Sequence, residues 1–209
     1  MDDKQWLETA DIINYGLASQ KDMAALNSVA SSVIRNRDYD RVLKCFDELL
    51  TVSAEAEAGK LAQKEQHIDR IKEEFIKSRI EILKEANLLK ELRHTNEAYI
   101  EKIAAEISEA QKYCDSHPYA PAQKAAPQLE LLKKRIYELT TSKIVAENFS
   151  AQLKLSEDNS FDMAEKIWNA LVTIMPLFKG NISLEAGQSV IAGARKLIED
   201  NMSAITSAV

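Results

Sequence analysis

The side chains in this chain best suited to metal chemistry are its three histidines, His67, His94 and His117. Glu91 and His94 stand three residues apart, the Glu-x-x-His spacing that helices of di-iron carboxylate bundles supply. Such a site needs a second Glu-x-x-His and two further glutamates, and the sequence holds no second Glu-x-x-His. We therefore expect no metal site and no cofactor, with His94 exposed on a helix and His117 in a turn.

Two thiols, Cys45 and Cys114, are the candidate nucleophiles. They stand far apart without a Cys-x-x-Cys spacing, which argues against a disulfide framework or a zinc site and suits a reducing cytosol. Cys45 falls in an apolar stripe beside Phe46, where a thiol packs as a small hydrophobic group. The sequence contains no Gly-rich phosphate loop, Gly-x-Ser-x-Gly or His-Glu-x-x-His motif. It therefore predicts a protein that is not an enzyme.

The strongest basic cluster is Lys133-Lys134-Arg135, with Lys143 further along the same expected helix. A bound oxyanion would favour such cations together with the free N–H groups of a helix start. The simpler interpretation is a solvated helix face with Ile136 turned inward. An anion site at these four cations is thus one hypothesis for function.

Composition narrows the classes of partner. The chain has 33 acidic and 27 basic residues and a net charge of −6, which argues against binding a nucleic-acid backbone. Its start, Met1-Asp2-Asp3, is acidic where a signal peptide would be basic. The longest apolar stretch, residues 167–178, is shorter than the roughly 20 residues that span a bilayer. We expect a cytoplasmic protein without direct membrane insertion.

A single long helix should position everything else. Residues 60–113 contain no proline, are rich in helix-forming residues, and show an apolar residue at almost every seventh position. At about 1.5 Å per residue this helix would be roughly 80 Å long, beyond the diameter of a compact globule of this size, so we expect an elongated molecule. Asn96 is the polar member of the row, and it either sets the register or contacts a ligand inside the bundle. The row is Leu61, Ile68, Phe75, Ile82, Leu89, Asn96, Ile103 and Ala110.

Shorter elements surround that helix. In the N-terminal part, Ser19 with Asp22 three residues on resembles a helix N-cap, and the small, acidic residues 52–59 suggest a joint. Pro118 and Pro121 should end the long helix, and Pro176 should kink the last one. The fold class we predict is all-α: an elongated helical bundle or coiled-coil hairpin forming one domain, 1–209. Its parts are short helices in 1–52, the long helix 60–113, an antiparallel return helix 127–157, a polar break at 157–159 and a kinked helix 160–202.

The kinked C-terminal helix carries the best candidate surface for a protein partner. Large apolar side chains around Pro176 fall on more than one helix face, and a few helices cannot bury all of them. The alternative is that they pack on the N-terminal helices. The candidate partner surface consists of Trp168, Met175, Leu177 and Phe178.

Several motifs together resemble the TelA-like toxic-anion (tellurite) resistance family. The resemblance spans roughly residues 14–201 and is strongest at 129–179. Where the family usually has an Arg, this chain has Lys143, and where it usually has a Trp, this chain has Phe178. The motifs are Tyr15-Gly16-Leu17-Ala18-Ser19-Gln20, Lys133-Lys134-Arg135-Ile136-Tyr137-Glu138-Leu139, Ser142-Lys143, Gln152-Leu153-Lys154-Leu155, Asn159, Glu165-Lys166-Ile167 and Met175-Pro176-Leu177-Phe178-Lys179.

That resemblance implies a cytoplasmic helical protein associated with tellurite resistance and stress response, acting beside other tellurium-resistance proteins and without an established reaction. Two hypotheses follow. The first is a non-enzymatic helical scaffold that binds protein partners, itself included. The second is a module that binds or sequesters an oxyanion or a metal directly.

Overall fold

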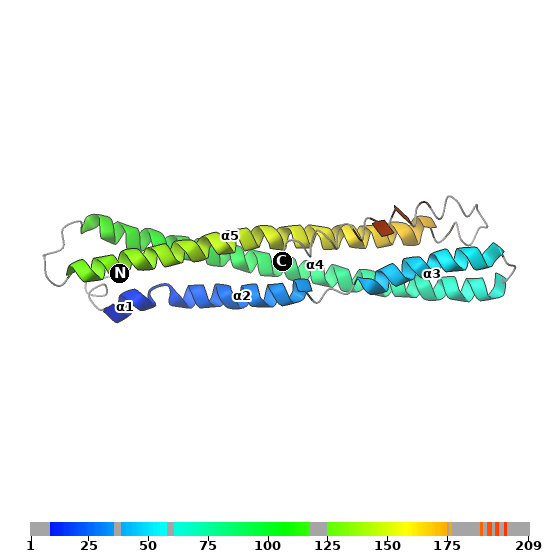
Figure 1. The fold of residues 1–209 in the computed structure, drawn as a ribbon, viewed down its shortest axis with the longest axis horizontal. Coiled ribbons are helices and arrows are strands. Elements are labelled where there is room, and N and C mark those ends of the chain that lie inside the picture. The colour runs from blue at the N-terminus through cyan, green and yellow to red at the C-terminus, as the bar shows by residue number, and fades with distance from the viewer. Residues whose placement is uncertain are drawn as a thin grey trace. The chain divides into compact units, whose positions relative to one another are not determined.

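The chain is almost entirely helical wherever its structure is described. The computed structural model describes residues 9–35, 39–57, 61–117 and 125–174, together with 176, 189, 192, 193, 195, 196 and 199. The helices are α1 (Thr9–Asn14), α2 (Leu17–Arg35), α3 (Asp40–Glu57), α4 (Leu61–Ser116) and α5 (Ala125–Asn169), followed by a π-helical turn, Ala170–Ile174 (Figure 1). No strand occurs in these ranges, which confirms the predicted all-α helical bundle.

Two compact units share the two long helices. Unit 1 comprises residues 1–32 and 91–154, and unit 2 comprises residues 33–90 and 155–209. Each unit therefore contains one part of α4 and one part of α5, which run antiparallel (Figure 1). To these, unit 1 adds α1 and most of α2, while unit 2 adds α3.

The predicted heptad row forms the buried side of α4. Its members are buried throughout the part of the row whose side chains are described, because a spacing of seven residues keeps them on one face of the helix. Asn96 is fully buried and donates from Nδ2 to the carbonyl of Ala146 on α5 at 2.9 Å, so it takes the role of a polar contact between helices. The buried row is Ile68, Phe75, Ile82, Leu89, Asn96, Ile103 and Ala110.

The two units have separate cores. In unit 2 the rings of Phe46 on α3 and Phe75 on α4 meet edge to face with their centroids 4.8 Å apart. Five further side chains before or within α3 are buried, namely Tyr39, Val42, Cys45, Leu49 and Val52. The core of unit 1 draws on α1, α2, α4 and α5, with Ile12, Tyr15, Met23, Ile103, Ala110, Cys114, Leu132, Leu139 and Ala146 at its centre.

One predicted boundary is wrong: α5 does not break at residues 157–159 but continues to Asn169. Polar residues on the inner side of this stretch are buried within the helix instead of ending it, whereas Asp158 is exposed. Ser156, Glu157 and Ser160 are buried, and the Ser160 hydroxyl lies within hydrogen-bond distance of the carbonyl of Ser156 and of Glu85 on α4. Because the Ser160 hydroxyl has partners inside the bundle, it needs no exposed loop.

Two N-terminal expectations are also corrected. Ser19 is not an N-cap, because α2 begins at Leu17 and the buried Ser19 hydroxyl bonds Glu106 on α4. The proposed joint at 52–59 is helical as far as Glu57, since α3 extends to that residue. Its alanines and glutamates are good helix formers.

A local widening of the helix precedes Pro176. Residues Ala170–Ile174 form a π-helical turn directly after α5. Proline has no N–H to donate and its ring clashes with the carbonyl four residues earlier, so a wider turn relieves the conflict. The predicted helix 160–202 otherwise falls mostly outside the described residues.

Candidate partner-binding surface

The candidate metal ligands do not converge. His94 is exposed and lies 3.2 Å from Glu97 on the same helix, and His117 stacks on Tyr113 at the end of α4. His67 lies 3.5 Å from Glu48, in unit 2. Across the described parts of the chain, no group of three or more His, Cys, Asp or Glu side chains could hold a metal ion.

Both thiols are buried and free. Burial raises the pKa of Cys45 to about 11, and burial also raises the pKa of Cys114. Thiolate is the nucleophilic form, so neither side chain is set up for nucleophilic attack at neutral pH.

The four cations of the predicted anion site point in different directions. Lys133 is exposed and pairs with Glu130 at 2.8 Å, whereas Lys143 pairs with Glu147 at 2.7 Å. Arg135 is buried and turned into unit 1. Successive residues on an α-helix are about 100° apart, so Lys133, Lys134 and Arg135 cannot share one face. The structure does not gather them around a common ligand.

Arg135 instead ties the α1–α2 turn to α5. Its Nε donates to the carbonyl of Tyr15 at 2.7 Å, while Nη2 donates to Gln20 at 2.8 Å and Nη1 to Glu138 at 2.9 Å. Gln20 in turn donates to Ser142. From the sequence we predicted Arg135 on a solvated face. The only signal for a contact with Arg135 was that Tyr15 and Gln20 stand together in one short motif.

The other side of the same turn rests on α4. The Tyr15 hydroxyl donates to the Glu106 carbonyl at 2.9 Å and to Glu109 at 2.8 Å. Burial raises the pKa of Tyr15, and the hydrogen bond from Tyr15 lowers the pKa of Glu109. Gly16 has φ 66°, and a Cβ there would lie 2.9 Å from both Glu106 and Leu139. The turn therefore requires glycine.

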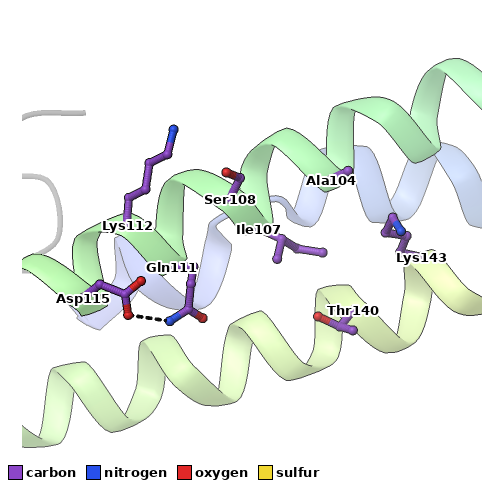
Figure 2. A pocket seen from close by; sticks show the side chains of 8 residues that line it. All are labelled: Ala104, Ile107, Ser108, Gln111, Lys112, Asp115, Thr140 and Lys143. Carbon is purple, nitrogen blue, oxygen red and sulfur yellow. Dashed lines mark hydrogen bonds between the residues drawn. The ribbon is translucent and has the colours of Figure 1, made fainter.

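A groove of about 410 Å³ lies between α4 and α5 of unit 1. Figure 2 shows Ile107, Thr140 and Lys143 lying between the two helices, while Lys112 points away. Asp115 accepts a hydrogen bond from Gln111 at 2.9 Å. Most of the surface lining the groove is apolar, although six of its eight residues have polar side chains. The lining consists of Ala104, Ile107, Ser108, Gln111, Lys112, Asp115, Thr140 and Lys143. No large exposed apolar side chain belongs to it.

In unit 2 the α4–α5 pair carries an exposed tryptophan instead. The Trp168 side chain is 49% exposed, although tryptophan usually contributes to a core or an interface. The Arg79 guanidinium lies over its ring, 4.9 Å from the ring centroid. Arg79 is itself held, because its Nε donates to the carbonyl of Ala164 at 3.2 Å. Trp168 is thus fixed in an exposed position.

Four more exposed apolar side chains lie around this pair. Ile76 and Ile80 precede and follow Arg79 by three residues and one residue, so the three share a sector of about 100° on α4. Phe161, Trp168 and Val172 lie within about 40° of one another along the second helix, at spacings of seven and four residues. We call Ile76, Ile80, Phe161, Trp168 and Val172 the Trp168 surface; their exposed fractions run from 37% for Phe161 to 52% for Val172.

Sequence reasoning found only Trp168 of this set. Met175, Leu177 and Phe178, the other predicted members of a partner surface, lie outside the described residues. The heptad pattern did not predict Ile76 and Ile80, because both lie off the row to which the buried Phe75 and Ile82 belong. Two isoleucines four residues apart and off that row were the available signal.

Comparison with known proteins identifies the family. Residues 55–191 match the family model described as "Toxic anion resistance protein (TelA)". The chain belongs to the TelA family. Its resemblance to that family, first read from short motifs, is thereby confirmed.

Curated TelA-like relatives are distant and longer. The chain is 23% identical over 197 residues to "TelA-like protein SSP1345" of Staphylococcus saprophyticus, covering 85% of this chain and 52% of that protein. It is 23% identical over 181 residues to "TelA-like protein SERP0976" of Staphylococcus epidermidis, covering 78% of this chain and 48% of that protein. The chain thus spans about half the length of these relatives. No solved structure matches it.

The TelA match covers both helices that build the surface. Residues 55–191 include all of α4 and α5, hence every residue of the Trp168 surface, while α1 and α2 lie outside the matched range. None of the described helices of this TelA-family chain is long and apolar enough to cross a membrane.

Proposed function

We propose that this TelA-family chain is a non-enzymatic interaction protein of tellurite resistance and stress response, and that it binds a helix of a protein partner at the Trp168 surface. The observation that carries the proposal is an exposed tryptophan locked by Arg79 among four other exposed apolar side chains. Cytoplasmic location and action beside other tellurium-resistance proteins belong to the same proposal.

Apolar side chains that face water are unfavourable in free energy, and covering them with a partner removes that cost. Exposed apolar side chains scattered singly are ordinary, but a contiguous group marks an interaction site. Tryptophan is enriched among the residues that dominate binding energy, where truncation costs about 2 kcal/mol or more. Because Arg79 already holds the ring in place, binding loses little further side-chain entropy.

The shape of the surface favours a helical partner. α3 contacts the α4–α5 pair through Phe75 and through Glu74, whose carboxylate accepts from Arg41 at 2.7 Å. Ile76 and Ile80 point away from that contact by about 100° or more on α4. A helix laid between their row and the row of Trp168 would complete a four-helix arrangement, the common way to bury such a seam.

The test is affinity capture from cells that produce tagged chain, with quantitative mass spectrometry of what is retained. We expect the Trp168→Glu variant to lose the specific partners that the unmodified chain retains. Val145→Glu is the matched control, since Val145 is an exposed apolar residue of α5, 55% exposed, outside the Trp168 surface. Equal retention by Trp168→Glu and Val145→Glu would show the proposal to be wrong.

A second candidate function is direct oxyanion binding in the groove of unit 1. The observation favouring it is that Lys143 and Thr140 lie between the two helices and that Ser108 and Lys112 also belong to the lining, although the Lys112 side chain points away. Calorimetry with potassium tellurite and, separately, inorganic phosphate tests it. Saturable binding that a Lys112→Gln, Lys143→Gln double variant loses would support this candidate, and flat titrations with both anions would eliminate it.

A further inference from the structure

We propose that the partner bound at the Trp168 surface is a second copy of this chain, so that two copies pair as a symmetric dimer. The inference rests on the proposed function, because it names the occupant of the same surface. The supporting observation is the charge along the two edges of the surface. A two-fold rotation places lysines on the α4 edge of one copy opposite carboxylates on the α5 edge of the other.

The α4 edge carries exposed lysines together with exposed Glu73 and Glu81, and the α5 edge carries exposed carboxylates that can meet those lysines. On the α4 side stand the exposed lysines Lys77 and Lys84, and on the α5 side stand the exposed carboxylates Asp162 and Glu165. Lys77 pairs with Glu74 at 3.0 Å. Lys84 and Asp162 are exposed and form no ion pair with any residue that the structure describes.

Contacts inside unit 2 show which residues of α4 and α5 stand level, that is, at the same height along the antiparallel pair. Arg79 reaches the carbonyl of Ala164, and Ser160 reaches Glu85. Numbers rise along α4 as they fall along α5, so the two contacts place Lys84 level with residues 159–161, one to three positions from Asp162. By the same rule, Lys77 stands level with residues 166–168, one to three positions from Glu165.

A two-fold axis parallel to the helices uses this match. It places α4 of one copy against α5 of the other, and each residue keeps its height along the axis. The rotation also preserves chain direction, and α4 and α5 are antiparallel within one copy, so every adjacent pair of helices is antiparallel. Lys84 of one copy then meets Asp162 of the other, and Lys77 meets Glu165. Each contact occurs twice, as symmetry demands.

The apolar residues fit the same arrangement. Ile76 stands level with Trp168, and Ile80 with the turn between Phe161 and Trp168, by the spacing fixed through Arg79 and Ala164. In the dimer, the isoleucines of one copy therefore cover the aromatic rings of the other. An apolar seam flanked by pairs of opposite charge is the pattern of a specific helix–helix interface.

The first measurement is the mass of the purified chain by sedimentation equilibrium over a series of concentrations. We expect wild-type chain to approach twice its 23.5 kDa monomer mass. Trp168→Glu should remain monomeric, and Val145→Glu should dimerise like wild type. Far-UV circular dichroism and the melting temperature of each variant establish that it is folded.

A charge exchange provides a test that leaves the apolar residues intact. Lys84→Glu alone and Asp162→Lys alone should each weaken the dimer by about tenfold, because each places like charges opposite one another twice. The Lys84→Glu, Asp162→Lys double variant should restore dimerisation to within about threefold of wild type. Lys134→Glu, at an exposed lysine of unit 1, is the control and should dimerise normally.

Three results would overturn the inference: a monomeric wild type at every concentration, a dimer that survives Trp168→Glu, or a double charge variant no better than the single ones. A monomeric wild type that nevertheless captures a different protein through Trp168 would overturn the dimer and leave the proposed function standing. Capture unaffected by Trp168→Glu would remove both.

Discussion

Both units attach further helices to the same pair by apolar packing and by polar contacts, but different contacts stand out in each. In unit 2, α3 is held by apolar packing, with Phe46 and Leu49 fully buried. In unit 1, the α1–α2 turn is held largely by hydrogen bonds to Arg135, Glu106 and Glu109. Large apolar side chains are exposed on α5 in both units: Tyr137, Ile144 and Val145 in unit 1, and Phe161 and Trp168 in unit 2.

The comparison teaches that apolar exposure alone does not distinguish the two units; what distinguishes unit 2 is an exposed tryptophan whose ring lies under the Arg79 guanidinium. The groove of unit 1 contains Ser108, Gln111, Thr140 and Lys143, which water satisfies without a partner. The Trp168 surface of unit 2 lacks that polarity and gains free energy when it is covered.

The largest expected effect contrasts the two aromatic positions of unit 2. Phe46→Ala should cost about 3–5 kcal/mol of unfolding free energy, because it leaves a cavity against Phe75. Trp168→Ala should cost less than about 1 kcal/mol, since half of that side chain is already exposed. Urea unfolding of both variants measures the difference. Equal losses would mean that Trp168 belongs to the core, and the contrast between packing and binding surface would fail.

The next effect concerns the α1–α2 turn of unit 1. Gly16→Ala should destabilise unit 1 by about 2–3 kcal/mol, because its φ of 66° and the nearby Glu106 and Leu139 atoms oppose a Cβ. Gly193→Ala is the control, since no atom lies within 4 Å of a Cβ placed there. Thermal unfolding of both variants measures the effect. A Gly16→Ala variant as stable as Gly193→Ala would contradict the geometry of the turn.

A similar effect is expected from the hydrogen bonds that tie the α1–α2 turn to α5. Arg135→Met should lower the unfolding free energy by about 2–3 kcal/mol, because Gln20 and the Tyr15 carbonyl lose their buried donor. Hydrogen exchange should accelerate in α2 first and leave α3 protected. Uniform acceleration in both helices would show that the two attachments are not independent.

The smallest effect is a pH dependence confined to unit 1. The hydrogen bond from Tyr15 lowers the pKa of Glu109 in the folded chain below its unfolded value. Its stabilisation is therefore fully present above the ordinary pKa of glutamate and is lost as pH falls through the lowered folded value. Tyr15→Phe should flatten the change in stability below about pH 5. Melting temperatures from pH 6 to about pH 3 measure it, and parallel profiles for the two proteins would refute the linkage.

Periodicity predicted the long elements well. Seven-residue spacing identified the buried side of α4 from Ile68 to Ala110, and Pro118 marked the end of the helix, since α4 ends at Ser116. The Asn96 contact with α5 was one of two interpretations and is the one that the hydrogen bond to Ala146 supports. These features succeed because they depend on neighbours along one helix.

The errors share a cause. Ser19, Glu157 and Ser160 looked like boundary residues, because polar side chains at those spacings usually cap helices or end them. Each instead lies buried, with Ser19 and Ser160 bonded to glutamates of α4. The partners are distant in sequence, so local rules assign such residues to solvent. Arg135 was misplaced for the same reason.

The sequence by itself determined the helical class, the course of α4 and the TelA family, because helix propensity, heptad spacing and motif identity are all written along the chain. Only the tertiary structure decided which side chains stay exposed. Ile76 and Trp168 lie more than ninety residues apart, and the contact of Arg79 with Trp168 and Ala164 brings their rows together. The exposed fraction of a side chain depends on which other helices pack over it, and those helices are distant in sequence.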